Sequence, residues 1–167
     1  MLNSFSDQLN ASFRDHPRLF CELASVKTTD KNWILVKPNT YMNESGKSVS
    51  ALSRFFKLVP EQCLILYDDV SLDFGTTRLS YVKNHGGHNG VRSIIESIGI
   101  GFMGYRIGVG PKLPPQIELK DFVLASFNES ELSNISKNVN IHLAEIASIL
   151  DRGALLAMNQ INKKSKK

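Results

Sequence analysis

The chain has 167 residues, of which 42% are hydrophobic and 22% are charged, a composition typical of one folded domain with its own core. It contains no apolar run near the roughly 20 residues that a membrane-spanning helix requires, and its N-terminus lacks the basic and apolar segments of a signal peptide. The net charge of +4 permits a nucleic-acid partner without requiring one, because part of it belongs to a basic tail at residues 162–167 and the rest is scattered.

The first third of the chain predicts a helix, two strands and a second helix. The first helix is marked by apolar residues at helical spacing: Phe5, Leu9 and Phe13. The segments "LFCELASV" (19–26) and "WILVKP" (33–38) indicate two strands on either side of the polar turn "KTTDKN". Pro38 ends the second strand and a loop follows at residues 39–43. The next helix has an apolar face made by Val49, Leu52, Phe55 and Phe56.

The rest of the chain continues to alternate strands with helices. "CLILYDD" (63–69) begins as a near-continuous apolar run, as expected of a strand buried on both faces, and "GTTRLSYV" (75–82) and "YRIGVG" (105–110) are further strand candidates. A helix after Gly86-Gly87 has one apolar face: Val91, Ile94, Ile95 and Ile98. Asn128 and Glu131 form a capping-box pattern before a long amphipathic helix. Its apolar residues are Leu132, Ile135, Val139, Leu143, Ile146 and Leu150.

This alternation predicts an α/β fold. We expect a single domain over residues 1–167, built on a twisted mixed sheet, largely parallel, with helices on both faces. The two cysteines, Cys21 and Cys63, lie in apparent strands far apart in the sequence. This placement favours buried, reduced thiols over a disulfide, and therefore a cytosolic protein.

Three polar segments are expected at the carboxyl ends of strands, where ligands bind in open α/β sheets. They are residues 39–43, the pair Asp68-Asp69, and the glycine-rich stretch that ends at Asn89. Neighbouring residues of a strand point to opposite faces, so Asp68 and Asp69 cannot act as a close carboxylate pair. One of them can orient a catalytic base while the other caps a turn, and plain turn chemistry accounts for both equally well.

Asn43 and Asn89 each precede a helical apolar pattern, where asparagine usually serves as an N-cap; a bound ligand is the alternative. His85 and His88, in "HGGHNG", raise the question of a metal site. Further ligands are not evident and a zinc site needs about four, so we expect no metal. The glycines allow close backbone approach or unusual dihedral angles, and the Lys-Ser/Thr ending of a phosphate-binding loop is missing.

Together these stretches resemble the bacterial peptidyl-tRNA hydrolase family. The match is carried by four motifs in order: "KPNTYMNESGKSV", "LILYDDVSLDFG", "GGHNGVRSII" and "YRIGVGPK". It extends from about the first helix to the C-terminal helix. The resemblance implies an enzyme that hydrolyses the ester joining a peptide to the terminal ribose of tRNA, which recycles tRNA from aborted translation. It also implies a cytoplasmic, monomeric protein that needs no cofactor.

The resemblance implies roles for four residues. Asn43 matches an asparagine that contacts the peptidyl ester and helps to place the attacking water, and Asn89 matches one that binds the substrate end. Tyr41 matches an aromatic residue that contacts the terminal nucleotide, and Asp68 matches a carboxylate that holds the catalytic histidine in its useful tautomer. The implied partner is therefore the acceptor end of peptidyl-tRNA, with no membrane involved.

The chain departs from the family pattern in two places. The family begins with a strand that ends in G-N-P-G, followed by an R-H-N motif that carries the catalytic histidine, and neither motif occurs in these 167 residues. His16 lies outside any R-H-N context, and Lys83-Asn84 stands where the family usually has glycines. The leading hypothesis is therefore a peptidyl-tRNA hydrolase without its first strand and its base. The alternatives are a non-catalytic RNA-binding relative and the inactive product of a decayed gene.

Overall fold

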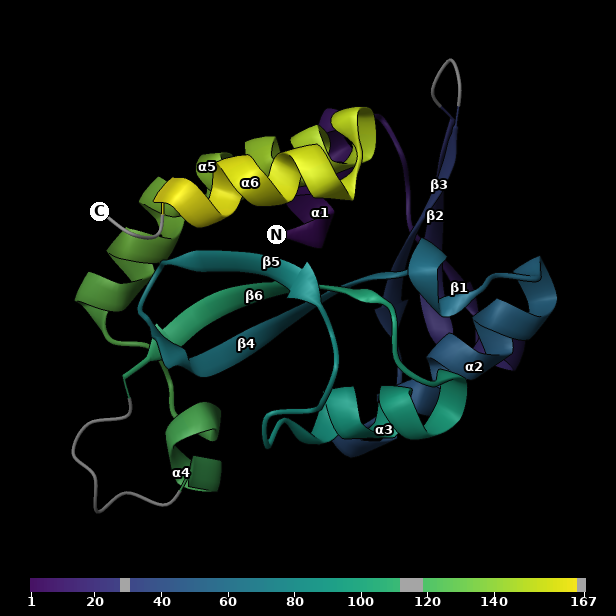
Figure 1. Ribbon diagram of the computed structural model, residues 1–167, viewed down its shortest axis with the longest axis horizontal. Coiled ribbons are helices and arrows are strands. Elements are labelled where there is room, and N and C mark those ends of the chain that lie inside the picture. Colours follow the sequence, from purple (N-terminus) through teal and green to yellow (C-terminus); the bar gives the residue numbers. More distant parts are fainter. Residues whose placement is uncertain (28–30, 112–118, 165–167) are drawn as a thin grey trace. The chain divides into compact units, whose positions relative to one another are not determined.

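The structure is a computed structural model that describes residues 1–27, 31–111 and 119–164 (Figure 1). The chain forms two compact units, one made of Met1–Cys63 and Val82–Phe102 and the other of Leu64–Tyr81 and Met103–Lys167. It passes from one unit to the other three times, so neither unit is a continuous stretch of sequence. Such interleaving is typical of a single domain rather than of two domains joined by a linker. In the described ranges, none of the helices has the length and apolar character needed to cross a membrane.

In the first unit, the described residues form three helices and an antiparallel sheet. Its helices and strands are α1 (Leu2–Gln8), β1 (Arg14–His16), β2 (Cys21–Lys27), β3 (Asn32–Pro38), α2 (Ser45–Phe56) and α3 (Asn89–Ile98). Single 3₁₀ turns lie at η1 (Pro17–Leu19), η2 (Met42–Glu44) and η3 (Pro60–Gln62). The strand order is β1-β2-β3. β2 and β3 pair from Cys21 opposite Pro38 to Lys27 opposite Asn32, since so short a connection can only join antiparallel neighbours.

Helix α2 packs on this sheet and on α3. Its apolar face is only partly covered: Val49 and Leu52 are buried, whereas Phe55 is 67% exposed. Gly46 lets α3 approach closely: its amide donates to Ser93 Oγ at 3.0 Å, and an added Cβ would lie 2.1 Å from the Ser93 carbonyl oxygen. The core beneath α2 consists of Leu19, Cys21, Leu23 and Leu52, with Ile34, Val36, Ala51 and Phe56 packed against it.

The described residues of the second unit form a mixed sheet and three helices. Its elements are β4 (Leu64–Asp73), β5 (Thr77–Tyr81), β6 (Met103–Gly110), α4 (Leu119–Leu124), α5 (Glu129–Arg152) and α6 (Ala154–Lys164). The strand order is β4-β6-β5, with β6 parallel to β4 and antiparallel to β5. Helix α5 begins with the expected capping box: Asn128 Oδ1 accepts the Glu131 amide at 2.9 Å, and Glu131 Oε2 accepts the Asn128 amide at 2.8 Å.

The α/β class and the mixed sheet are confirmed, and the two cysteines are free, with Cys21 buried and Cys63 half-buried. Burial raises the pKa of both thiols. The share of parallel pairing is smaller than expected, because β4 with β6 is the single parallel pair among the described strands. The apolar pattern of a strand does not distinguish parallel from antiparallel pairing. The short connection between β2 and β3, however, allows only antiparallel pairing.

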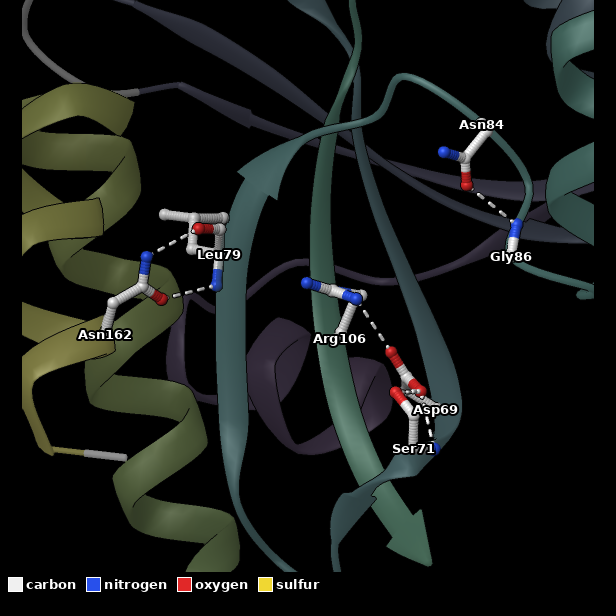
Figure 2. A network of polar contacts seen from close by, with 7 residues as sticks. All are labelled: Asp69, Ser71, Leu79, Asn84, Gly86, Arg106 and Asn162. Atoms are coloured by element: carbon white, nitrogen blue, oxygen red, sulfur yellow. Dashed lines mark hydrogen bonds and ion pairs between the residues drawn. The ribbon is translucent and has the colours of Figure 1, made fainter. Parts of the chain in front are cut away.

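The expected basic tail at residues 162–167 overlaps the end of α6. Residues up to Lys164 belong to α6, and residues 165–167 lie outside the described residues. The Asn162 carboxamide accepts the Leu79 amide at 3.0 Å and donates to the Leu79 carbonyl at 2.9 Å (Figure 2). It thus bonds the backbone of β5, an edge strand of the sheet, much as a neighbouring strand would. The proline-rich loop after Gly110 also falls mostly outside the described residues.

Candidate functional site

Tyr41 and Asn43 lie in the turn that leads from β3 to α2. Tyr41 precedes η2 in an extended conformation and its side chain is 80% exposed. Asn43 lies inside η2 and is also exposed. The residue at the N-cap position of α2 is Glu44, and no side chain caps that helix. Asn43 is therefore not the helix cap that its position in the sequence suggested.

Asn89 is likewise not the cap of its helix. The N-cap of α3 is His88, whose Nδ1 accepts the Val91 amide at 3.2 Å, while Asn89 is the first residue of the helix and is exposed. Histidine is not among the favoured N-cap residues, so the pattern pointed to the neighbouring asparagine. Among the described residues, the carboxamides of Asn43 and Asn89 have no hydrogen-bond partner. Both side chains are thus available to a ligand.

A close contact joins the two segments that carry the asparagines. Helix α3 packs against η2, and Gly90 lies against Met42. A Cβ added to Gly90 would stand 2.6 Å from Met42 Sδ and 3.1 Å from the Met42 carbonyl oxygen. Since Met42 precedes Asn43 and Gly90 follows Asn89, the two backbone segments that carry the asparagines meet at this contact. With the exposed Tyr41 ring, they form what we call the asparagine site: Tyr41, Asn43 and Asn89.

The loop before α3 uses its side-chain acceptors internally. Asn84 Oδ1 accepts the Gly86 amide at 3.1 Å, and His85 Nδ1 accepts the Gly87 amide at 3.0 Å. A neutral imidazole whose Nδ1 is an acceptor carries its hydrogen on Nε2. Neither His85 nor His88 therefore presents a free ring lone pair in this arrangement. The described residues contain no group of three or more side chains that could hold a metal ion.

Asp68 and Asp69 lie at the end of the parallel part of β4, opposite Ile107 and Gly108 of β6. Asp69 Oδ2 pairs with an Arg106 terminal nitrogen at 3.0 Å, and its Oδ1 accepts the Ser71 amide at 2.8 Å and the Ser71 hydroxyl at 2.6 Å (Figure 2). Asp69 is thus the carboxylate that serves turn chemistry. Asp68 is half-buried on the strand.

A buried polar cluster in the second unit escaped the sequence analysis. The hydroxyls of Tyr105 and Thr77 donate to Glu145 Oε2 at 2.8 and 2.9 Å, and the Tyr105 oxygen lies 3.1 Å from His142 Nδ1. Because the Tyr105 hydrogen is committed to Glu145, the tyrosine oxygen can only accept from Nδ1, which fixes a hydrogen on that nitrogen. The spacing of His142 and Glu145 on one face of a helix was the available signal, but it also fits an ordinary solvated pair.

The comparisons with known proteins agree with one another. The family model described as "Peptidyl-tRNA hydrolase" matches residues 1–167. A peptidyl-tRNA hydrolase of Lachnoclostridium phytofermentans is 43% identical over 132 residues, covering 78% of this chain and 69% of that protein. One of Sorangium cellulosum is 41% identical over 145 residues, covering 86% of this chain and 65% of that protein.

Comparison with solved structures indicates the same family. A crystal structure of peptidyl-tRNA hydrolase from Acinetobacter baumannii is similar with a TM-score of 0.87 at 30% identity, over 96% of this chain and 82% of that chain. The present chain spans about two thirds of the length of the two curated relatives described above. From the extent of these matches, the chain belongs to the peptidyl-tRNA hydrolase family.

Proposed function

We propose that the chain acts in the hydrolysis of the ester bond between peptide and tRNA in peptidyl-tRNA, which recycles tRNA from aborted translation. One observation carries the proposal beyond family membership. Tyr41, Asn43 and Asn89 are exposed, the two carboxamides are not used as helix caps, and the two segments that carry them meet where Gly90 lies against Met42. We further propose that the protein works in the cytoplasm as a monomer and without a cofactor.

The asparagine site suits an ester next to a ribose. Ester hydrolysis needs hydrogen-bond donors for the carbonyl oxygen as negative charge develops on it, and a polar group that places the attacking water. Asn43 can place the attacking water, and Asn89 can bind the substrate end. The exposed Tyr41 ring offers a face on which the terminal base can stack.

The remaining requirement is a general base, with Asp68 as its positioning residue. We propose that Asp68 holds the imidazole of the catalytic histidine in the tautomer that can accept a proton from water. The R-H-N motif that carries this histidine in the family does not occur in the 167 residues. His85 and His88 are poor substitutes, because their Nδ1 atoms accept the amides of Gly87 and Val91.

The 167-residue chain should therefore be a poor hydrolase by itself. A general base contributes about 10²–10⁴-fold to such a reaction, and this contribution is the one expected to be missing. Release of free tRNA from peptidyl-tRNA by the purified chain measures it. Turnover at the level of other family members would contradict the expectation, and His85→Ala and His88→Ala would then identify a substitute base.

Translation of the genomic frame upstream of Met1 separates this proposal from its alternative. A preceding strand with G-N-P-G and R-H-N would supply the histidine, and the extended chain should then hydrolyse peptidyl-tRNA. The alternative function is that of a non-catalytic RNA-binding relative. It is favoured by the coexistence of an available asparagine site with histidines whose Nδ1 atoms are already engaged. An extended chain that binds the substrate without cleaving it would establish that alternative.

A further inference from the structure

Helix α6 covers one edge of the mixed sheet with a side chain that acts like a peptide group. The order β4-β6-β5 leaves one side of β5 without a neighbour among the described strands. Helix α6 packs against β5, and the Asn162 carboxamide bonds the Leu79 amide at 3.0 Å and the Leu79 carbonyl at 2.9 Å (Figure 2). An open strand edge is a template for another chain, and these two bonds occupy the place where a further strand would pair.

The two bonds show which backbone groups of β5 point away from β6. In an antiparallel pair, a residue either exchanges both backbone hydrogen bonds with its partner or directs both groups to the other side. Leu79 directs its N–H and C=O to Asn162, so it is of the second kind, opposite Tyr105 of β6. Because the two kinds alternate along a strand, Thr77 and Tyr81 direct their backbone groups to the same side as Leu79.

The sequence of β5 is complementary to itself around Leu79. If two copies pair antiparallel with Leu79 opposite Leu79, the two leucines exchange two hydrogen bonds and Thr77 lies opposite Tyr81. The remaining pairs set Arg78 opposite Ser80, so no two like charges face each other. Within the strand there is neither a proline nor a break in register, the features that often block an edge. The edge beneath α6 is therefore suited to a second copy of itself.

The attachment of α6 to the rest of the second unit is small. Ala157 and Ile161 are buried, whereas Leu155 and Leu156 at the start of the helix are more than half exposed. Segments with few buried apolar contacts open locally at a lower free energy than the core does. The two hydrogen bonds of Asn162 are thus a large part of what holds α6 on β5.

We propose that α6 is a detachable cover that keeps β5 from pairing with β5 of a second copy of this chain. While α6 is docked, Asn162 occupies the two Leu79 groups and the chain is a monomer. When α6 is released, two β5 strands join around a twofold axis and the two mixed sheets become one continuous sheet. None of these residues belongs to the asparagine site, so the interface is independent of the proposed hydrolysis.

Asn162→Asp weakens the cover without changing the shape of the side chain. A carboxylate still accepts the Leu79 amide, but its second oxygen replaces the donor and repels the Leu79 carbonyl. The matched control is Asn159→Asp, which makes the same charge change at an exposed position of α6. Exchange of the Leu79 amide hydrogen, followed by NMR in dilute protein, should be about tenfold faster in Asn162→Asp and unchanged in Asn159→Asp.

Sedimentation equilibrium over a series of protein concentrations measures the association. A dimer needs two released copies, so a tenfold rise in opening should raise the apparent association constant of Asn162→Asp by about a hundredfold. Asn159→Asp should associate no more than the parent does. In Asn162→Asp, exchange of the Leu79 amide should also become slower as the protein concentration rises, because pairing with the second copy protects it.

Substitution of Ser80 identifies β5 as the joining surface. In the Asn162→Asp chain, Ser80→Arg places an arginine opposite Arg78 of the second copy and should weaken the dimer by about fivefold. Ser80→Glu places a carboxylate there and should strengthen the dimer by about the same factor. Aggregation through exposed apolar side chains, or pairing through β4, would not follow the charge at residue 80 in this way.

Three results would overturn the proposal: an association constant of Asn162→Asp equal to that of Asn159→Asp, equal effects of Ser80→Arg and Ser80→Glu on the dimer, or exchange of the Leu79 amide that does not depend on the concentration of Asn162→Asp. If Asn162→Asp does not fold, Asn162→Ala replaces it and Asn159→Ala becomes the control. That variant removes both hydrogen bonds without adding a charge, and the same three results apply to it.

Discussion

At the scale of single residues, the position of a cap decides how the site is interpreted. Asparagine before an apolar helical pattern predicts an N-cap, yet α3 is capped by His88 and α2 has no side-chain cap. A shift of one residue converts Asn89 from a structural group into an available carboxamide. Sequence patterns locate helix ends only to within a few residues, so they cannot tell whether Asn89 or its neighbour is the cap. The family resemblance, in contrast, predicts a role for both asparagines without knowledge of the caps.

Gly90 gives a direct test of how the asparagine site is held together. In Gly90→Ala, the new methyl group would meet Met42 Sδ and the His88 ring, which should move η2 away from α3. We expect about tenfold weaker binding of the adenosine ester, an N-blocked aminoacyl ester of adenosine that has no phosphate. Stability should change little, because alanine is favoured over glycine in a helix by about 1 kcal/mol and this offsets part of the strain.

Calorimetric titration of the ester and thermal unfolding of the variant measure the two effects. Met42→Ala in the same chain removes the sulfur that the methyl group meets and should restore part of the affinity. Glu96→Ala, at an exposed position of α3, is the control. Parental affinity in Gly90→Ala would show that the contact does not position the asparagines.

At the scale of elements, the pattern of apolar residues predicted most helices and strands, but not how much of each one is buried. The long amphipathic helix α5 was predicted with its cap, yet Leu132 and Ile135 near its start are exposed, whereas Leu143 and Ile146 are buried. Periodicity indicates which face of a helix is apolar. How much of that face is buried depends on how far the neighbouring elements extend along the helix. Helix α6 was not predicted, and its last three residues fall within the expected basic tail.

The buried cluster between α5 and the mixed sheet should make stability depend on pH. Burial lowers the pKa of His142, and the charge of Glu145 opposes this shift only in part. Burial and Glu145 both raise the pKa of Tyr105, which stays protonated. At pH values between the lowered pKa of His142 in the folded state and the ordinary histidine value of about 6.5, the unfolded chain binds more protons than the folded one. Stability is therefore complete above that ordinary value and decreases as the pH falls below it.

His142→Asn provides the test, because asparagine can still donate to the Tyr105 hydroxyl oxygen but does not titrate. Urea denaturation at about pH 7.5 and about pH 5.5 gives the free energy of unfolding at each. The parent should lose more of it on acidification than His142→Asn does, and His16→Asn should behave like the parent. Equal losses in the parent and His142→Asn would exclude this ring as the source.

At the scale of the whole molecule, the α/β class and the family followed from the sequence because four motifs occur in the right order. The interleaved two-unit organisation did not, since no linker or change in composition marks the points where the chain passes between units. The central claim is that Tyr41, Asn43 and Asn89, contributed by two separate segments of the chain, form one surface for the acceptor end of tRNA.

Titration of the adenosine ester into the parent, Asn43→Ala and Asn89→Ala tests this claim most directly, with Asn159→Ala as the control on α6. Each loss of a carboxamide should weaken binding of the ester by about tenfold, and Asn159→Ala should bind like the parent. With bare tRNA, the dependence of affinity on salt should be unchanged in both site variants, because neither carboxamide carries charge. If Asn43→Ala and Asn89→Ala bind the ester as tightly as the parent, the asparagine site is not the site of ester recognition.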